Sequence, residues 1–393
     1  MIKEFKITNF YSIYETQAVS FSILKKDMLD ESSFETQTGN KLNNIIAVIG
    51  NNASGKTNIL KGLSFLLWFS HHSYFRMSVD ENIPAEPHKL HSDENTSFEL
   101  LFENNGKEYQ YKLSVNRQSV CYEYLGVKNI RGFSAIYEIK KENDDIVFLK
   151  WNLGKLTDDD KERFVKRKNS SLFSFLLNTG HLPAVGINDI LKFGHNVTNL
   201  GKREDNIYDM YEELSNTFAQ NPQRKEKILK FVKDMDFGVS DFDFTPAADN
   251  KKKLVVKHKS GQREFALSFW EESNGTQNAI YLLNAVLSAL ESGAVFIYDE
   301  LESSIHTYIA KKIVGLFANK ITNPKNAQIL FSTHQPWLLD DRTKTQIYLV
   351  EKDEKFETEI YRLDEVEGVR NDDNYCAKYL SGAYGAVSKM RWF

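Results

Sequence analysis

A glycine-rich segment between an apolar run and a helical pattern limits the possible folds of this chain more than any other feature. The apolar run, residues 43–49, suits a strand that is buried on both faces of a sheet. The segment after it matches the pattern GxxxxGK[ST] in full, with Gly50, Asn51, Asn52, Ala53, Ser54, Gly55, Lys56 and Thr57. Glycines let the backbone wrap closely around an anion, and the next helix adds aligned amides. The pattern therefore predicts a phosphate-binding loop in an α/β fold.

Two side chains of this loop have predicted chemical roles. Lys56 is expected to meet the β and γ phosphates of a nucleotide, and the Thr57 hydroxyl is expected to be a ligand of Mg²⁺. A simple glycine turn between strand and helix is the structural alternative, but it leaves Lys56 without a purpose. ATP and Mg²⁺ are therefore the expected cofactors.

Two further apolar strands end in polar side chains. Residues 294–298 run into Asp299 and Glu300, and residues 328–333 run into His334. Ligands of open α/β sheets bind at the carboxyl ends of the strands. We expect Asp299 to hold the metal through water, and Glu300 to polarise the attacking water as general base. His334 is expected to contact the γ-phosphate, although a histidine after a strand is often structural.

A helix is expected at residues 276–291, directly before the strand that ends in the two acids. The residues just before this helix are Ser273, Asn274 and Gly275, and its first residues are Thr276 and Gln277. Serine and glycine at a helix start form a second anion-binding end. A simple N-cap formed by Ser273 is the alternative.

Composition excludes several classes of protein. The net charge of −4 and the pI near 6.2 argue against a surface wholly committed to nucleic acid or to an anionic membrane. The two cysteines, Cys121 and Cys376, lie far apart without metal-binding spacing, which favours a reducing, cytoplasmic setting. No secretory signal and no apolar run of the ~20 residues that span a membrane are present, so we expect no membrane partner.

Periodicity divides the chain into three expected parts. Residues 1–149 hold the phosphate loop and an antiparallel layer of strands, with strands expected at 97–103, 108–115 and 136–139. Residues 150–237 form a helical insertion, and residues 238–393 form a second lobe. One helix of the insertion is crowded with apolar residues that either face a partner or pack on the first lobe: Leu172, Phe173, Phe175, Leu176 and Leu177.

Taken together, these motifs resemble the ATPase heads of the ABC, SMC and OLD (overcoming lysogenization defect) type. The resemblance is closest to prokaryotic AAA-family ATPases found in phage-defence and abortive-infection operons. It extends to residues 379–387, Tyr-Leu-Ser-Gly-Ala-Tyr-Gly-Ala-Val, and leaves about 80–240 without a counterpart. It implies an α/β fold, an ABC/SMC-like ATPase head with an antiparallel β lobe and a helical insertion.

The resemblance also implies residue roles. Ser273 and Gly275 match the signature positions, Glu300 the catalytic acid, residues 302–304 a dimer-contacting loop, and His334 the switch histidine. In such heads the signature end reaches the phosphate loop of a second protomer. We therefore expect a homodimer or higher oligomer with two composite ATP sites.

The sequence departs from the related motifs at two points. Asn274 replaces the glycine-like residue of transporters, and no glutamine loop is assigned, with Gln110 and Gln118 as weak candidates.

The function implied is an ATP-hydrolysing switch of an abortive-infection-like defence system. It would sense nucleic acid or a phage-derived trigger and control an operon-encoded nuclease or toxin. Fewer than 60 residues follow His334, so we expect any nuclease to be a separate partner. An SMC-like ATPase of DNA maintenance or repair is the alternative, although no heptad pattern is sustained. A transporter motor is disfavoured, because nothing indicates membrane coupling.

Overall fold

The computed structural model describes most of the chain. The described ranges are 1–23, 30–143, 145–153, 156–181, 193–198, 201–202, 207–235, 237–246, 252–303 and 305–387. The account below is restricted to these residues.

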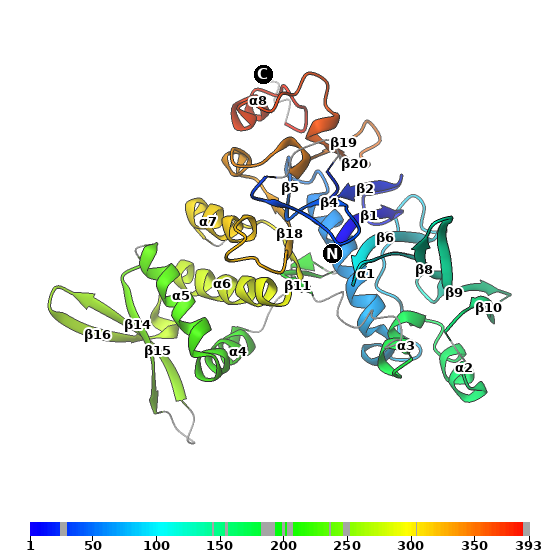
Figure 1. The fold of residues 1–393 in the computed structure, drawn as a ribbon, viewed down its shortest axis with the longest axis horizontal. Helices are drawn as coiled ribbons and strands as arrows, with labels where there is room; N and C mark the ends of the chain where they lie inside the picture. The colour runs from blue at the N-terminus through cyan, green and yellow to red at the C-terminus, as the bar shows by residue number, and fades with distance from the viewer. Residues whose placement is uncertain are drawn as a thin grey trace.

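A six-stranded sheet lies in the middle of the molecule (Figure 1). In spatial order it contains β11 (Phe193–His195), β17 (Val295–Tyr298), β18 (Gln328–Thr333), β5 (Ile45–Gly50), β19 (Ile347–Lys352) and β20 (Thr358–Arg362). The first five strands are parallel, and β20 is antiparallel at the edge. Because β18 pairs with both β5 and β17, the carboxyl ends of these three strands lie next to one another.

Each central strand is buried on both faces, which explains its continuous apolar sequence. In β5, Ile46 and Val48 belong to one hydrophobic core, whereas Ile45, Ala47 and Ile49 belong to another. Successive side chains of a strand point to opposite faces, so the sheet separates the two cores.

The first core lies between the central sheet and an antiparallel sheet of seven strands. That sheet has the order β10-β9-β8-β7-β6-β1-β2, with β1 (Ile2–Thr8), β2 (Gln17–Ser20), β6 (Thr96–Asn104), β7 (Lys107–Val115), β8 (Val120–Asn129), β9 (Gly132–Glu142) and β10 (Asp145–Trp151). The core is completed by α1 (Lys56–Arg76), α2 (Asp158–Val165) and α3 (Leu172–Asn178). A short hairpin, β3 (Ser33–Glu35) and β4 (Lys41–Asn43), precedes β5. The predicted antiparallel layer is confirmed.

The second core is mainly helical and lies on the other side of the central sheet (Figure 1). It is built from α4 (Ile207–Gln220), α5 (Pro222–Asp234), α6 (Asn274–Ser292), α7 (Thr307–Ala318) and α8 (Tyr375–Leu380). The sheet of β14 (Val239–Pro246), β15 (Lys252–Ser260) and β16 (Arg263–Ser268) packs beside α4 and α5. The pair β12 (Val197–Thr198) and β13 (Gly201–Lys202) follows β11.

The described parts of residues 150–237 contribute to both cores. Phe164 of α2 belongs to the first core with all of α3's large side chains, whereas Leu214 of α4 and Ile228 of α5 belong to the second. The crowded apolar residues of α3 are buried or packed against the first core, so packing accounts for them. The three-part division of the chain stays a prediction, and residues 182–192 within the insertion lie outside the described ranges.

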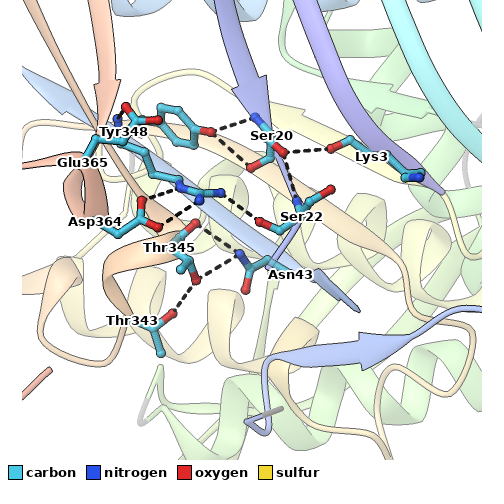
Figure 2. A network of polar contacts seen from close by, with 10 residues as sticks. Lys3, Ser20, Ser22, Asn43, Thr343, Thr345, Tyr348, Asp364 and Glu365 are labelled. Carbon is cyan, nitrogen blue, oxygen red and sulfur yellow. Dashed lines mark hydrogen bonds and ion pairs between the residues drawn. The ribbon is translucent and has the colours of Figure 1, made fainter. Parts of the chain in front are cut away.

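Polar contacts join the N-terminal strands to the C-terminal ones (Figure 2). The amide of Ser20 donates to the Tyr348 hydroxyl at 2.7 Å, and that hydroxyl donates to the Ser20 carbonyl at 3.2 Å. Arg362 binds Asp364 through two nitrogens and donates to the carbonyl of Ser22 at 2.8 Å. These contacts attach β2 and the segment after it to β19 and β20.

A side-chain amide makes a second connection between the two sheets. Gln328, at the start of β18, accepts from the amide of Ile2 at 2.7 Å and donates to its carbonyl at 2.9 Å. The Gln328 side chain is buried, so it pairs with β1 much as a neighbouring strand would. The antiparallel sheet is therefore held directly to the strand at the centre of the six-stranded sheet.

A buried carboxylate holds the start of α3. Glu123 of β8 has no solvent exposure, and burial raises its pKa. It accepts hydrogen bonds from five groups, namely the hydroxyls of Tyr111 (3.0 Å), Tyr137 (2.8 Å) and Ser171 (2.8 Å) and the amides of Leu172 (2.8 Å) and Phe173 (2.9 Å). The carboxylate thus connects three strands to one helix.

Replacing this carboxylate should destabilise the fold. Glu123→Leu leaves five buried donors without their acceptor, and we expect the free energy of unfolding to fall by about 3–5 kcal/mol. Glu123→Gln keeps one oxygen and should cost less. Urea unfolding followed by circular dichroism measures both, with Glu142→Gln at the exposed end of β9 as the control, expected within about 0.5 kcal/mol of wild type. A loss in Glu123→Leu no larger than in the control would contradict this role.

Candidate functional site

The glycine-rich loop lies between β5 and α1, and its close neighbours explain both glycines of the GxxxxGK[ST] pattern. Gly55 has a φ of 108°, and a Cβ there would lie 2.1 Å from the hydroxyl oxygen of Thr358. A Cβ on Gly50 would lie 2.1 Å from the carbonyl oxygen of Val350. The β19–β20 hairpin therefore packs directly against the loop, and a side chain at either position would clash with it.

Lys56 lies across the loop that precedes it. Its Nζ donates to the carbonyl oxygens of Gly50 and Asn51, both at 2.8 Å. Burial lowers the pKa of Lys56 to about 8, although nearby carboxylates oppose the shift. The Ser54 Oγ beside it is buried and has no hydrogen-bond partner within the described part of the chain. A loop with a buried cation and an unused hydroxyl fits an anionic ligand.

A hydroxyl of the loop contacts the acid at the end of β17. Thr57 Oγ1 donates to Asp299, at 3.0 Å to Oδ2 and 3.2 Å to Oδ1. Ser332 at the end of β18 donates to Asp299 Oδ1 at 2.6 Å. Asp299 is almost fully buried. Hydroxyl and carboxylate oxygens are the hard ligands that Mg²⁺ prefers, so Thr57 and Asp299 fit the ion expected from the sequence.

Glu300 points toward the space beside His334. Its φ of 50° is uncommon for a residue with a side chain, and its amide donates to Ser332 Oγ at 2.7 Å. Its Oε1 lies 3.9 Å from His334 Nε2, and each side chain is about one-third exposed, at 34% and 33%. Burial, with a contribution from Lys56, lowers the pKa of His334 and favours the neutral imidazole. An accessible carboxylate thus lies beside a neutral ring.

Glu302 ties the loop after β17 to the end of β18. Its carboxylate accepts from the Thr333 hydroxyl at 2.8 Å and from the amide of His334 at 2.6 Å. Glu302 therefore helps to fix the position of His334. Ser304, the last residue of the predicted dimer-contacting loop, lies outside the described residues.

The structure places residues 273–277 at the start of α6, beside α4 and the β14–β16 sheet and well apart from β5 in Figure 1. Ser273 is the N-cap and accepts from the amide of Thr276 at 3.1 Å, as both interpretations of the sequence require. Ser273 and Asn274 are exposed. A Cβ on Gly275 would meet only Ser273 Oγ, at 3.8 Å, so this helix end is open to a ligand or a second chain.

The structure adds Asn196, which sequence reasoning missed. Asn196 follows β11, donates to the carbonyl of Asp299 at 2.9 Å and accepts from its amide at 2.6 Å. The sequence signal for this residue is weak, because β11 is three residues long. The two glutamine candidates lie elsewhere, with Gln110 on β7 bound to Glu99 and Gln118 in an exposed bend.

Thr358 is a second residue that the sequence did not reveal. It is buried on β20, donates to the carbonyl of Ser54 at 2.9 Å and lies 2.7 Å from the hydroxyl of Ser12. Ser12 in turn accepts from Asn58 of α1 at 2.7 Å. These contacts support the phosphate loop from its outer side.

Comparison with known proteins identifies the family. Residues 45–340 match the family described as "AAA domain, putative AbiEii toxin, Type IV TA system". The chain belongs to this family of AAA ATPases. The match includes the phosphate loop, residues 273–277, the strand ending in Asp299 and Glu300, and His334.

Two further comparisons were made, with curated proteins and with solved structures. Curated proteins gave no match. Among solved structures, the SMC head domain from Thermotoga maritima is similar, with 14% sequence identity and a TM-score of 0.43, over 92% of this chain and 98% of that one. None of the helices in the described ranges has the length and apolar character needed to cross a lipid bilayer.

The lowered pKa of Lys56 predicts that ATP binding by this AAA ATPase depends on pH. Bound phosphates favour the charged lysine, so affinity should be steady below pH 7 and fall as pH rises through the free-site pKa of about 8, approaching tenfold per unit. Titration calorimetry from pH 6 to 9.5 measures this. Lys56→Ala should bind weakly at every pH, and the exposed-site control Lys320→Ala should behave as wild type. Affinity unchanged to pH 9.5, or retained in Lys56→Ala, would contradict the assignment.

Proposed function

We propose that this protein is an ATP-binding and ATP-hydrolysing switch with composite sites in a dimer, acting in an abortive-infection-like defence against phage. The observation that carries the proposal is the convergence of Lys56, Thr57, Asp299, Glu300 and His334 at the carboxyl ends of three adjacent strands. Membership of the AAA family supports nucleotide binding by this set.

Each residue of the site would have a separate role in ATP hydrolysis. Lys56 and the amides of the loop would hold the phosphates, and Thr57 and Asp299 would hold Mg²⁺. When bound, Mg²⁺ neutralises charge that develops on the phosphate oxygens. The accessible carboxylate of Glu300 would take a proton from the attacking water, and the neutral ring of His334 can donate a hydrogen bond to the γ-phosphate.

The exposed start of α6 supports a dimer. Residues 273–277 present an N-cap serine, an open glycine and the aligned amides of a 19-residue helix to the outside of the protomer. In the proposed dimer this end covers the ATP held by the phosphate loop of the other protomer. Each ATP would then require both chains, and hydrolysis would rise more steeply than linearly with protein concentration.

Mixing two inactive variants tests the composite site. Lys56→Ala inactivates the phosphate loop and leaves the α6 end intact. Gly275→Asp leaves the loop intact and places a carboxylate that repels ATP phosphates at the α6 end, where a Cβ has room. Half the dimers in an equal mixture are mixed, each with one intact site, so we expect about a quarter of wild-type ATPase activity. The double variant Lys56→Ala/Gly275→Asp mixed with either single variant should stay inactive. An inactive mixture in which mass spectrometry detects mixed dimers would refute shared sites.

The defence role rests on the family and on the description of that family. That description names a putative AbiEii toxin and a type IV toxin–antitoxin system. We propose that the switch acts in the cytoplasm, that nucleic acid or a phage-derived molecule triggers it, and that an operon-encoded nuclease or toxin is the partner it controls. Differential affinity of that partner for the ATP-bound and ATP-free forms would couple hydrolysis to output. DNA maintenance or repair by an SMC-like ATPase is the second candidate.

Phage challenge combined with co-purification separates these two functions. Lys56→Ala should abolish protection because it cannot bind ATP, and Glu300→Gln should hold ATP and retain the operon neighbour in one nucleotide state. Plating efficiency and pull-down from cells measure the two effects, with Lys320→Ala as the matched control. If no neighbour is retained in any nucleotide state and Lys56→Ala leaves plating unchanged, the DNA-maintenance function takes its place.

A further inference from the structure

The β14–β16 sheet, here called the arm sheet, leads directly into the α6 end. It lies at the edge of the molecule, on the outer side of α4 and α5 (Figure 1). Its last strand, β16, is largely exposed, and Phe265 on this strand is 49% exposed. Only one short 3-10 turn, Phe269–Glu271, and Glu272 separate β16 from Ser273.

One buried contact connects the arm sheet to the residue before Ser273. His258 of β15 places Nε2 2.6 Å from Glu272 Oε1 and Nδ1 2.9 Å from the carbonyl oxygen of Gly238. Its ring stacks on Phe265 at 5.3 Å. Only 13% of the His258 side chain and 5% of the Glu272 side chain are exposed. The contact is therefore a side-chain hydrogen bond that joins β15 to the residue before Ser273.

Glu272 is fixed at both ends. Its carboxylate is held by His258, and its carbonyl oxygen accepts from the side chain of Gln277 in the first turn of α6 at 2.9 Å. The next residue, Ser273, has the N-cap conformation that sets the direction of the helix end. Without His258 the buried side chain of Glu272 would lose its hydrogen-bond partner, and the segment would have to move to hydrate it.

We infer that His258 is a positioning residue for the ATP site of the other protomer. Through Glu272 it holds Ser273 and Gly275 in the orientation that receives ATP from the partner's phosphate loop. The inference rests on the composite site proposed above. It adds a means of regulating that site, because a movement of the exposed arm sheet would be transmitted to the α6 end through the contact between His258 and Glu272. The effect is exerted in trans, so it can be separated from any effect on the chain's own phosphate loop.

The two-variant mixture provides the test, because in the active mixed dimer one chain supplies only the α6 end and the other supplies only the phosphate loop. His258→Phe keeps the ring against Phe265 and removes both hydrogen bonds. Placed in the Lys56→Ala chain, which supplies the α6 end, it should lower ATPase activity of the mixture by about tenfold or more. Placed in the Gly275→Asp chain, which supplies only the phosphate loop, it should change activity less than about twofold.

Two controls accompany this test. His258→Gln can still donate to Glu272 and should restore most of the activity when placed in the Lys56→Ala chain. Lys259→Ala, at the exposed neighbour on β15, should have no effect in either chain.

The possible outcomes are distinct. Equal losses in both chains would show a general effect on folding, and no loss in either would show that Glu272 needs no partner; each overturns the positioning role. An inactive parent mixture, measured before any His258 variant is added, overturns the composite site and this inference with it.

Discussion

Backbone pairing of β18 with β5 on one side and with β17 on the other brings the nucleotide site together. β5 ends at residue 50 and β17 begins at residue 295, yet the carboxyl ends of all three strands meet at one edge. Thr57, Asp299 and Ser332 are in contact only because of this pairing. The buried hydroxyls and carboxylate satisfy one another, so the strand ends carry polar groups at the edge of two apolar cores without leaving them unpaired.

The strands and the helix that carry the proposed nucleotide site could be predicted from the sequence because their signals are local. The glycine pattern requires a strand before it and a helix after it, and parallel strands deliver their last residues to a common edge. Helices with clear periodicity were also placed well, since α6 was expected at 276–291 and begins and ends within two residues of that range.

The contacts that the sequence did not reveal are those between distant segments without a repeating pattern. Asn196 follows a three-residue strand, and Thr358 begins a short strand that has no motif around it. Neither can be assigned until the pairing of β11 with β17 and of β20 with β19 is known. The same holds for His258 and Glu272, which only the antiparallel turn from β15 to β16 and the following helix bring together.

The support that Thr358 gives to the phosphate loop has a consequence for synthesis of the chain. Ser54 and Thr358 are 304 positions apart, which takes roughly 15 to 60 s of translation at 5–20 residues per second. Until residues 328–352 have been made, β5 has neither β18 nor β19 beside it, and the backbone N–H and C=O groups along its edges lack their partners. The antiparallel sheet of β6 to β10 is complete by residue 151 and can shield α1 on one side. A nascent chain of this protein therefore cannot complete the contacts that support its glycine-rich loop before residue 358 has been made.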